Sequence, residues 1–211
     1  MDNLLDGLVA NLKPVRRRRA TVEAVVLAGL FAIELAVWLL MGNARENLVH
    51  VVQTTPAFWW KLGGAALLMA VGGSTAVASF DPSASPRRGL ALLGVMFGVF
   101  LAIGFVLDGK QGFSDIAARL SLWPGLLCSA YIITLSIPPM AALALLMRLG
   151  APTDKAATAV VCGLAAAGWG AFVFVFSCPH DDPLFVAVWY PAATATSALL
   201  ARLVLPSISR W

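Results

Sequence analysis

The residues best suited to chemistry gather in one short turn, FSCPHDDPLF, at residues 176–185. This turn brings together a thiol, an imidazole and two carboxylates, from Cys178, His180, Asp181 and Asp182. Thiols and imidazoles bind soft divalent ions, and thiols that face an oxidising compartment form disulfides. The alternative is a turn without a chemical role, because Asp182 before Pro183 favours extended backbone and can cap the next helix. Both interpretations stay open on the sequence alone.

Three cysteines are present, and two of them flank apolar runs at corresponding positions. Cys128 lies near the start of one run, after LWPGLL, and Cys178 lies at the end of the next. Cys162 sits inside a run and is interpreted as a small packing residue. It is a poor partner for Cys178, because the intervening helical residues span about 24 Å. For Cys128 and Cys178 a structural disulfide, a thiol sensor and a metal site with His180 and Asp181 all remain open.

The elements that must position these residues are membrane-spanning helices. Of the 211 residues, 60% are apolar and 12% are charged, whereas an ordinary soluble domain has about 25% charged residues. A bilayer core takes about 20 helical residues. We therefore predict an all-α fold, an integral membrane bundle of six transmembrane helices in residues 20–211, preceded by a tail of residues 1–19. The predicted helices are 20–42, 58–80, 89–107, 122–147, 155–177 and 184–205.

The positions of Lys and Arg predict the orientation of this bundle, because cytoplasmic loops are enriched in both. With the N-terminus inside, only Arg45, Lys61, Lys110 and Arg119 lie on the outer side. Both termini are then cytoplasmic, and Cys128 and Cys178 both lie at the outer end. Basic residues that cluster beside apolar runs also argue against direct binding of nucleic acid.

The tail, MDNLLDGLVANLKPVRRRR, is the only predicted extramembrane segment long enough to bind another protein. Its apolar side chains recur at helical spacing and form one face, which Pro14 ends. A short helix with an apolar face requires a partner, either the membrane surface or a groove on a protein. The face consists of Leu4, Leu5, Leu8, Val9 and Leu12.

Features inside the spans suggest where helices bend and pack. Pro138 and Pro139 should kink the fourth helix, which also carries Cys128. A kink there is either a hinge for signalling or one of the inert prolines that many membrane helices contain. The pair Gly94 and Gly98 forms a G-x-x-x-G pattern, which is typical of close helix packing. Gly163 begins a similar pattern in the fifth helix, with Ala167 and Ala171.

Glu34 is predicted near the middle of the first helix, in LFAIELAVW. A carboxylate at mid-bilayer costs about 2.5 kcal/mol or more, so such residues are usually functional. It could belong to a proton path, or accept a hydrogen bond from a hydroxyl such as that of Thr75 or Ser136. Because no second ionisable residue is predicted at this depth, we interpret Glu34 as a protonated structural residue.

Three stretches of the sequence resemble one protein family. They are LVANLKPVRR in the tail, WPGLLCSAY at the start of the fourth helix, and CPHDDPLFVAVWYP leading into the sixth. In these stretches the chain resembles the NrsF type of bacterial membrane anti-sigma factors (negative regulator of sigma F). The last stretch is the most specific of the three, and the resemblance covers essentially the whole chain.

The resemblance implies a multi-pass protein of the bacterial inner membrane that keeps an extracytoplasmic-function sigma factor from RNA polymerase. It also implies two periplasmic cysteines needed for the response to oxidants or heavy metals, and by position these are Cys128 and Cys178. We place the sigma-binding surface on residues 1–19, because no other sizeable cytoplasmic segment is predicted. The expected partners are the sigma factor, the lipid bilayer and a thiophilic metal ion, with no cofactor.

Two other classes of membrane protein fit the sequence less well. A small transporter or channel should line its path with several intramembrane polar residues, and only Glu34 qualifies. A membrane thiol oxidoreductase usually needs a reactive C-x-x-C, a quinone site or a haem site, and the chain has only His50 and His180 as histidines. Neither class explains the apolar face of the tail. We therefore expect a sensor-regulator and not an enzyme.

Overall fold

The computed structural model describes residues 20–108 and 116–208 of the chain, and all the elements in these two ranges are helices. The predicted tail of residues 1–19 and its apolar face lie outside the described residues. Six helices are long and apolar enough to cross a membrane, which confirms the predicted fold class. These candidate spans are Thr21–Asn43, Pro56–Ser79, Arg87–Asp108, Leu122–Leu149, Lys155–Val175 and Pro183–Ile208.

The described elements follow one another with short connections. In chain order they are α2 (Ala20–Trp38), the π-helical turn η1 (Leu39–Asn43), α3 (Leu48–Thr54), α4 (Pro56–Ser79), α5 (Arg87–Asp108), α6 (Ile116–Arg119), α7 (Leu122–Leu135), α8 (Ile137–Leu149), α9 (Lys155–Val175) and α10 (Pro183–Ile208). The short helices α3 and α6 stand where the sequence indicated only loops. Gly42 ends the first span in a left-handed conformation (φ 77°) that glycine adopts without strain.

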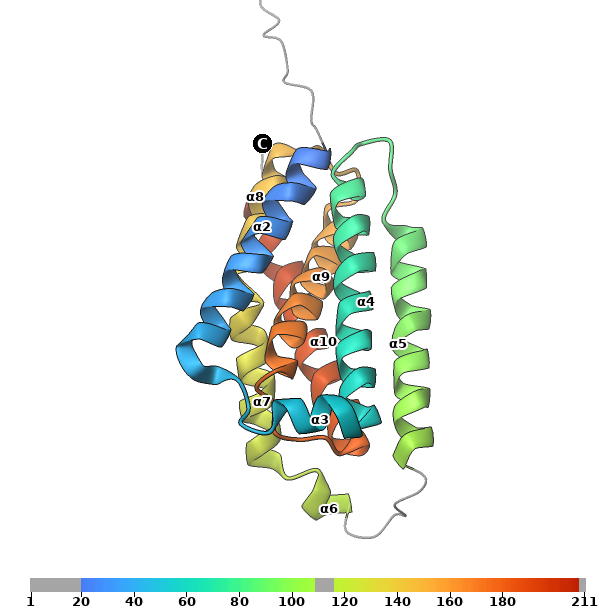
Figure 1. Ribbon diagram of the computed structural model, residues 1–211. Helices are drawn as coiled ribbons and strands as arrows, with labels where there is room; N and C mark the ends of the chain where they lie inside the picture. The colour runs from blue at the N-terminus through green and yellow to red at the C-terminus, as the bar shows by residue number, and fades with distance from the viewer. Residues whose placement is uncertain (1–19, 109–115, 209–211) are drawn as a thin grey trace, which may run out of the picture.

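The bundle has two different ends (Figure 1). The start of α2 and the end of α10 lie together at one, here called the terminal end, as an even number of crossings requires. At the opposite end, here called the loop end, lie α3, α6 and the turn between α9 and α10. The residues of FSCPHDDPLF therefore lie as far as the bundle allows from the described chain ends.

Helix α9 forms the centre of the bundle and is buried along most of its length. It packs most extensively against α4 and α10, and its glycines allow this close approach. A Cβ on Gly163 would lie 2.7 Å from the Ala198 Cα, which confirms the predicted packing role. Within the bundle the same prediction is wrong for Gly94 and Gly98, which are exposed and where an added Cβ would meet no neighbouring segment within 4 Å.

Helix α2 and helix α5 lie at opposite edges of the bundle (Figure 1). No residue from Thr21 to Asn43 is buried, so α2 is the span least embedded in the protein. Its main aromatic contact is Phe31, whose ring meets that of Trp169 edge-on at 4.5 Å and that of Phe172 at 5.4 Å. Leu30, Leu35 and Trp38 also pack against the buried core, so α2 is attached to the bundle through one partly buried face.

The fourth span is interrupted, as the two prolines predict. Helix α7 ends at Leu135 and α8 begins at Ile137, with Ser136 between them. Pro138 and Pro139 then occupy the first turn of α8, where their missing N–H groups leave carbonyls of α7 without helical partners. The Ser136 hydroxyl donates a 2.7 Å hydrogen bond back to the Ile132 carbonyl of α7. Whether this break acts as a hinge stays a prediction.

Candidate functional site

The turn between α9 and α10 has a defined backbone at both of its ends. The amides of Ser177 and Cys178 both donate 2.9 Å hydrogen bonds to the Phe174 carbonyl and end α9. At the other end the Asp182 carboxylate accepts hydrogen bonds from the Leu184 amide at 2.8 Å and the Phe185 amide at 3.3 Å. Asp182 therefore caps α10, as the sequence predicts. The residues between the two ends are presented in one fixed conformation.

This turn and α7 bring two thiols and an imidazole together. The sulfur atoms of Cys128 and Cys178 and a ring nitrogen of His180 all lie within 4.8 Å of one another. Both cysteines are buried free thiols, and the Cys178 thiol donates to the His180 carbonyl at 3.6 Å. Cys162 lies in a different apolar cluster, toward the terminal end. The structure thus pairs the two cysteines that the sequence selected and separates the third.

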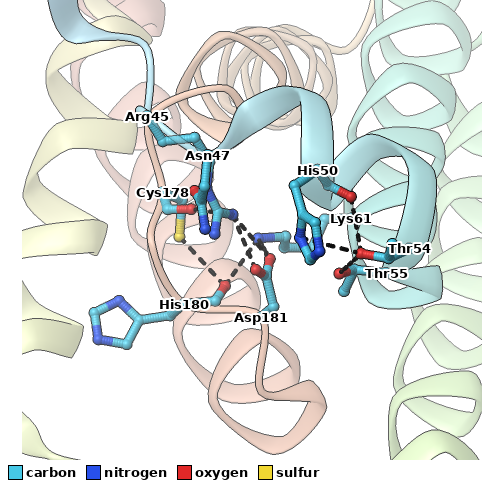
Figure 2. Close-up of polar contacts among 9 residues, drawn as sticks. All are labelled: Arg45, Asn47, His50, Thr54, Thr55, Lys61, Cys178, His180 and Asp181. Atoms are coloured by element: carbon cyan, nitrogen blue, oxygen red, sulfur yellow. Dashed lines mark hydrogen bonds and ion pairs between the residues drawn. The ribbon is translucent and has the colours of Figure 1, made fainter.

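The fourth ligand candidate from the sequence, Asp181, faces a different set of partners (Figure 2). Its carboxylate forms ion pairs with Lys61 Nζ at 2.7 Å and with Arg45 Nη1 at 2.9 Å. Lys61 is completely buried and also donates a 2.8 Å hydrogen bond to the His180 carbonyl. Figure 2 shows the His180 imidazole pointing away from these ion pairs. Asp181 thus fixes the turn to α4 and does not join the thiol group.

The second carboxylate of the turn is bound in the same way to α6. Arg119 donates hydrogen bonds to both carboxylate oxygens of Asp182, at 2.7 and 2.8 Å, and also binds Asp108 at the end of α5. A bidentate guanidinium–carboxylate pair fixes both distance and orientation. Together Asp181 and Asp182 connect the turn to α4, α5 and α6. We call Arg45, Lys61, Asp108, Arg119, Asp181 and Asp182 the ion-pair clamp.

The charges of the ion-pair clamp act on the groups that titrate in the turn. A hydrogen bond with the Cys128 thiol lowers the pKa of Cys178; burial opposes this shift, while His180 and the positive charge of Lys61 reinforce it. Burial alone would raise the pKa of Asp182, but hydrogen bonds from Arg119 and from the Phe185 amide outweigh it and lower that pKa. Cys178 therefore has increased thiolate character, and the thiolate is the form that attacks oxidants and binds metals.

A cleft of about 320 Å³ leads to this site from the side of α2. Because a water molecule in liquid fills about 30 Å³, the cleft admits ions and small oxidants. Two of the three grouped side chains line its wall, beside polar groups of η1 and of the turn. The lining includes Trp38, Asn43, Cys128, Tyr131, Ser177 and His180.

The end of the first span is attached to the same turn by hydrogen bonds from Trp38 and Arg45, in addition to the ion pair of Arg45 with Asp181. The Trp38 indole N–H donates to the Ser177 hydroxyl at 2.7 Å. The Arg45 amide donates to the Phe176 carbonyl at 3.0 Å, and its guanidinium donates to the Cys178 carbonyl at 3.0 Å. The thiol-bearing segment is thus the main polar anchor that the structure gives to the loop end of this span.

The sequence did not predict the ion-pair clamp. It predicted a buried Glu34, but not the partners of its carboxyl group. Lys61 stands in the apolar stretch FWWKLGG and was interpreted only as an outer basic residue, although a Lys among so many apolar neighbours indicates a buried partner. Both carboxyl oxygens of Glu34 are buried without a hydrogen-bond partner among the described residues. The Ser136 hydroxyl, one suggested donor, instead binds a backbone carbonyl.

A helical bundle of six apolar spans, with buried thiols, an imidazole and an ion-pair clamp at its loop end, fits a multi-pass membrane protein with a polar site at that end. Residues 8–211 match the family described as negative regulator of sigma F (NrsF), and the chain belongs to that family. Its class is therefore that of the anti-sigma factors, whose partner is a sigma factor. No curated protein and no solved structure matches the chain.

Proposed function

We propose that this protein is an inner-membrane anti-sigma factor that binds an extracytoplasmic-function sigma factor and releases it when a periplasmic thiol pair reacts. The pair is Cys128 and Cys178, and the inducer is an oxidant or a heavy metal. One observation supports this most strongly: two free thiols from different helices share one buried site at the loop end. A structural role alone does not call for a cleft that reaches this site.

The proposed orientation places the loop end in the periplasm and the terminal end in the cytoplasm. The distribution of basic residues supports it, because Arg87, Arg88, Arg148, Lys155 and Arg202 lie toward the terminal end and the sequence before α2 carries five more. The loop end does contain Arg45, Lys61 and Arg119, yet these are bound to carboxylates in the ion-pair clamp. Residues 1–19 then extend into the cytoplasm from the start of α2 and provide the sigma-binding surface.

The chemistry of the proposed trigger is a two-electron oxidation of the pair. Hydrogen peroxide would take two electrons and two protons from the two thiols, forming one S–S bond and two water molecules. The sulfur atoms now lie within 4.8 Å of each other, and a disulfide joins them at about 2.05 Å. Bridging therefore draws α7 and the Cys178 turn closer together.

Two connections support transmission of this movement to the terminal end. The turn holds the end of the first span through Trp38 and Arg45, and α2 leads from there directly to the tail. Helix α7 leads to α8 through the break at Ser136, next to Pro138 and Pro139. A coupling of about 1–3 kcal/mol between the two ends would change sigma binding roughly 5- to 150-fold.

Promoter activity of the cognate sigma regulon tests this function, measured with and without oxidant or cadmium. We expect the wild type and the Cys162→Ser control to respond, and the Cys128→Ser/Cys178→Ser double variant to give constant output at normal expression. A double variant that responds like the wild type would show that the pair is structural. If no sigma factor co-purifies with the wild-type chain, the proposed anti-sigma function is refuted.

A further inference from the structure

We propose that Cys128, Cys178 and His180 form a binding site for one soft divalent cation, with two thiolates and one imidazole nitrogen as ligands. The site deepens the proposed function, on which its effect on sigma release rests, but the binding of the ion does not depend on that function. His180 is the new element, because it turns a thiol pair into a site with a defined ligand set and preference.

The separation of the three ligand atoms fits one shared ion. Zinc binds thiolate sulfur at about 2.3 Å and imidazole nitrogen at about 2.0–2.1 Å, which places such ligands roughly 3.5–4 Å from one another. The sulfur atoms of Cys128 and Cys178 and the ring nitrogen of His180 already lie within 4.8 Å of one another. Even at the 4.8 Å limit, a shift of less than an ångström per side chain closes the remaining gap.

The His180 ring is held in place and has unused binding capacity. It stacks on the Phe185 ring with centroids 4.4 Å apart and planes 13° from parallel. Its backbone carbonyl is held by Lys61 Nζ at 2.8 Å. The Nδ1 atom is buried and has no hydrogen-bond partner among the described residues. A buried nitrogen without a partner is unfavourable, so the imidazole is available as a ligand for an ion.

Charge selects a divalent ion for this site. Two thiolates and one divalent cation sum to zero, and each thiol gives up one proton to solvent as the ion binds. A neutral complex suits the burial of both sulfur atoms. The Asp181 carboxylate of the same turn is already paired with Lys61 and Arg45, and no carboxylate belongs to the group of ligand atoms among the described residues, so this group does not suit a hard cation such as Mg²⁺. Sulfur and nitrogen ligands favour Zn²⁺ or Cd²⁺.

The cleft supplies both a route for the ion and a place for a further ligand. It reaches Cys128 and His180, and its wall carries the polar side chains of Asn43 and Ser177. A water molecule from the cleft can complete a four-coordinate site, as in other sites with three protein ligands. Such a site exchanges its ion more readily than a closed four-ligand site, which suits a sensor better than a structural centre.

Titration of the full-length, reduced protein with Cd²⁺ alone, in detergent micelles, tests the proposal. We expect one ion per chain, a thiolate-to-cadmium charge-transfer band, and X-ray absorption showing two sulfur ligands and an imidazole. The band should disappear in Cys128→Ser and in Cys178→Ser and persist in Cys162→Ser. A wild type that shows no band, or only one sulfur ligand, would overturn the proposal.

His180→Phe keeps the ring stack on Phe185 but removes the nitrogen, and His50→Phe is the matched control. Outer-shell partners of metal ligands are commonly worth 10- to 100-fold in affinity, so loss of a direct ligand should weaken Cd²⁺ binding at least ~10-fold. His180→Asn serves as a second variant if the first unfolds. If folded His180 variants bind Cd²⁺ with unchanged affinity and give an unchanged X-ray absorption spectrum, His180 is not a ligand.

Sigma release, measured on the same samples, separates this proposal from the proposed function. Cadmium bound by two sulfurs and an imidazole, with the sigma factor still attached, would support the ion site and refute metal-triggered release. If His180→Phe still releases the sigma factor as the wild type does, and Cd²⁺ is bound by sulfur alone, the thiol-pair sensor is supported and the three-ligand site is overturned.

Discussion

The indole N–H of Trp38 and the hydroxyl of Ser177 are joined by a 2.7 Å hydrogen bond across 139 residues of sequence. Ser177 precedes the thiol-bearing Cys178, and Trp38 is the last residue of α2. Because no residue of the first span is buried, this bond and those of Arg45 are its principal polar attachments at the loop end. The geometry therefore places the helix that leads to the tail in direct contact with the candidate site.

Trp38→Phe should weaken the response to oxidant while leaving thiol chemistry intact. The variant keeps the aromatic contact with Tyr131 and loses only the bond to Ser177, worth about 0.5–1.5 kcal/mol. Regulon output and disulfide formation are measured in parallel after addition of peroxide. Trp59→Phe is the control, because its indole binds a carbonyl of α3, away from the thiols. An unchanged response in Trp38→Phe would remove α2 from the signalling route.

Lys61→Met should destabilise the protein by about 1–3 kcal/mol, because it leaves the His180 carbonyl with only the weak Cys178 thiol donor and Asp181 with Arg45 alone. The measurement is thermal unfolding in detergent. In the double variant Lys61→Met/Asp181→Asn the loss should be smaller than the sum of the single effects, since the two side chains interact directly. Strict additivity would contradict the ion pair, and Arg88→Gln on an exposed position should have little effect.

Gly170→Ala should cost about 1–3 kcal/mol of stability, because an added Cβ would lie 2.4 Å from the Ile132 carbonyl oxygen and 2.6 Å from the Ser136 hydroxyl. The clash lies where α9 passes the break between α7 and α8. Gly98→Ala is the matched control, since open space surrounds that position. Equal unfolding temperatures for the two variants would show that this contact is not close.

The sequence predicted some features of this fold and could not predict others. Hydropathy predicted the six spans, because run length and lack of charge are local properties. The G-x-x-x-G of α5 failed as a packing signal, since spacing does not say which face of a helix meets the bundle. Pairing of Cys128 with Cys178 followed from topology, whereas Lys61 with Asp181 depends on the side-chain directions of distant segments. Only the folded chain shows such a pair.

Pro138→Ala/Pro139→Ala tests whether the break below α7 is a hinge. Restoring two backbone N–H groups should favour a continuous helix and reduce regulon output after oxidant, without slowing formation of the disulfide. Output and disulfide formation are measured together, and Pro191→Ala in α10 is the control for loss of a helical proline elsewhere. A full response in the double variant would assign the prolines to packing.

Leu8→Asp/Leu12→Asp should abolish co-purification of the sigma factor, because carboxylates on the apolar face of the tail would oppose burial against a partner. Losing two buried leucines removes about 3–6 kcal/mol of apolar burial, which corresponds to at least a ~100-fold loss of affinity. Regulon output should then be high and independent of oxidant, while cadmium binding at the loop end remains unchanged. Asp6→Asn, off this face, is the control. Retention of the sigma factor by the double variant would exclude residues 1–19 as its binding surface.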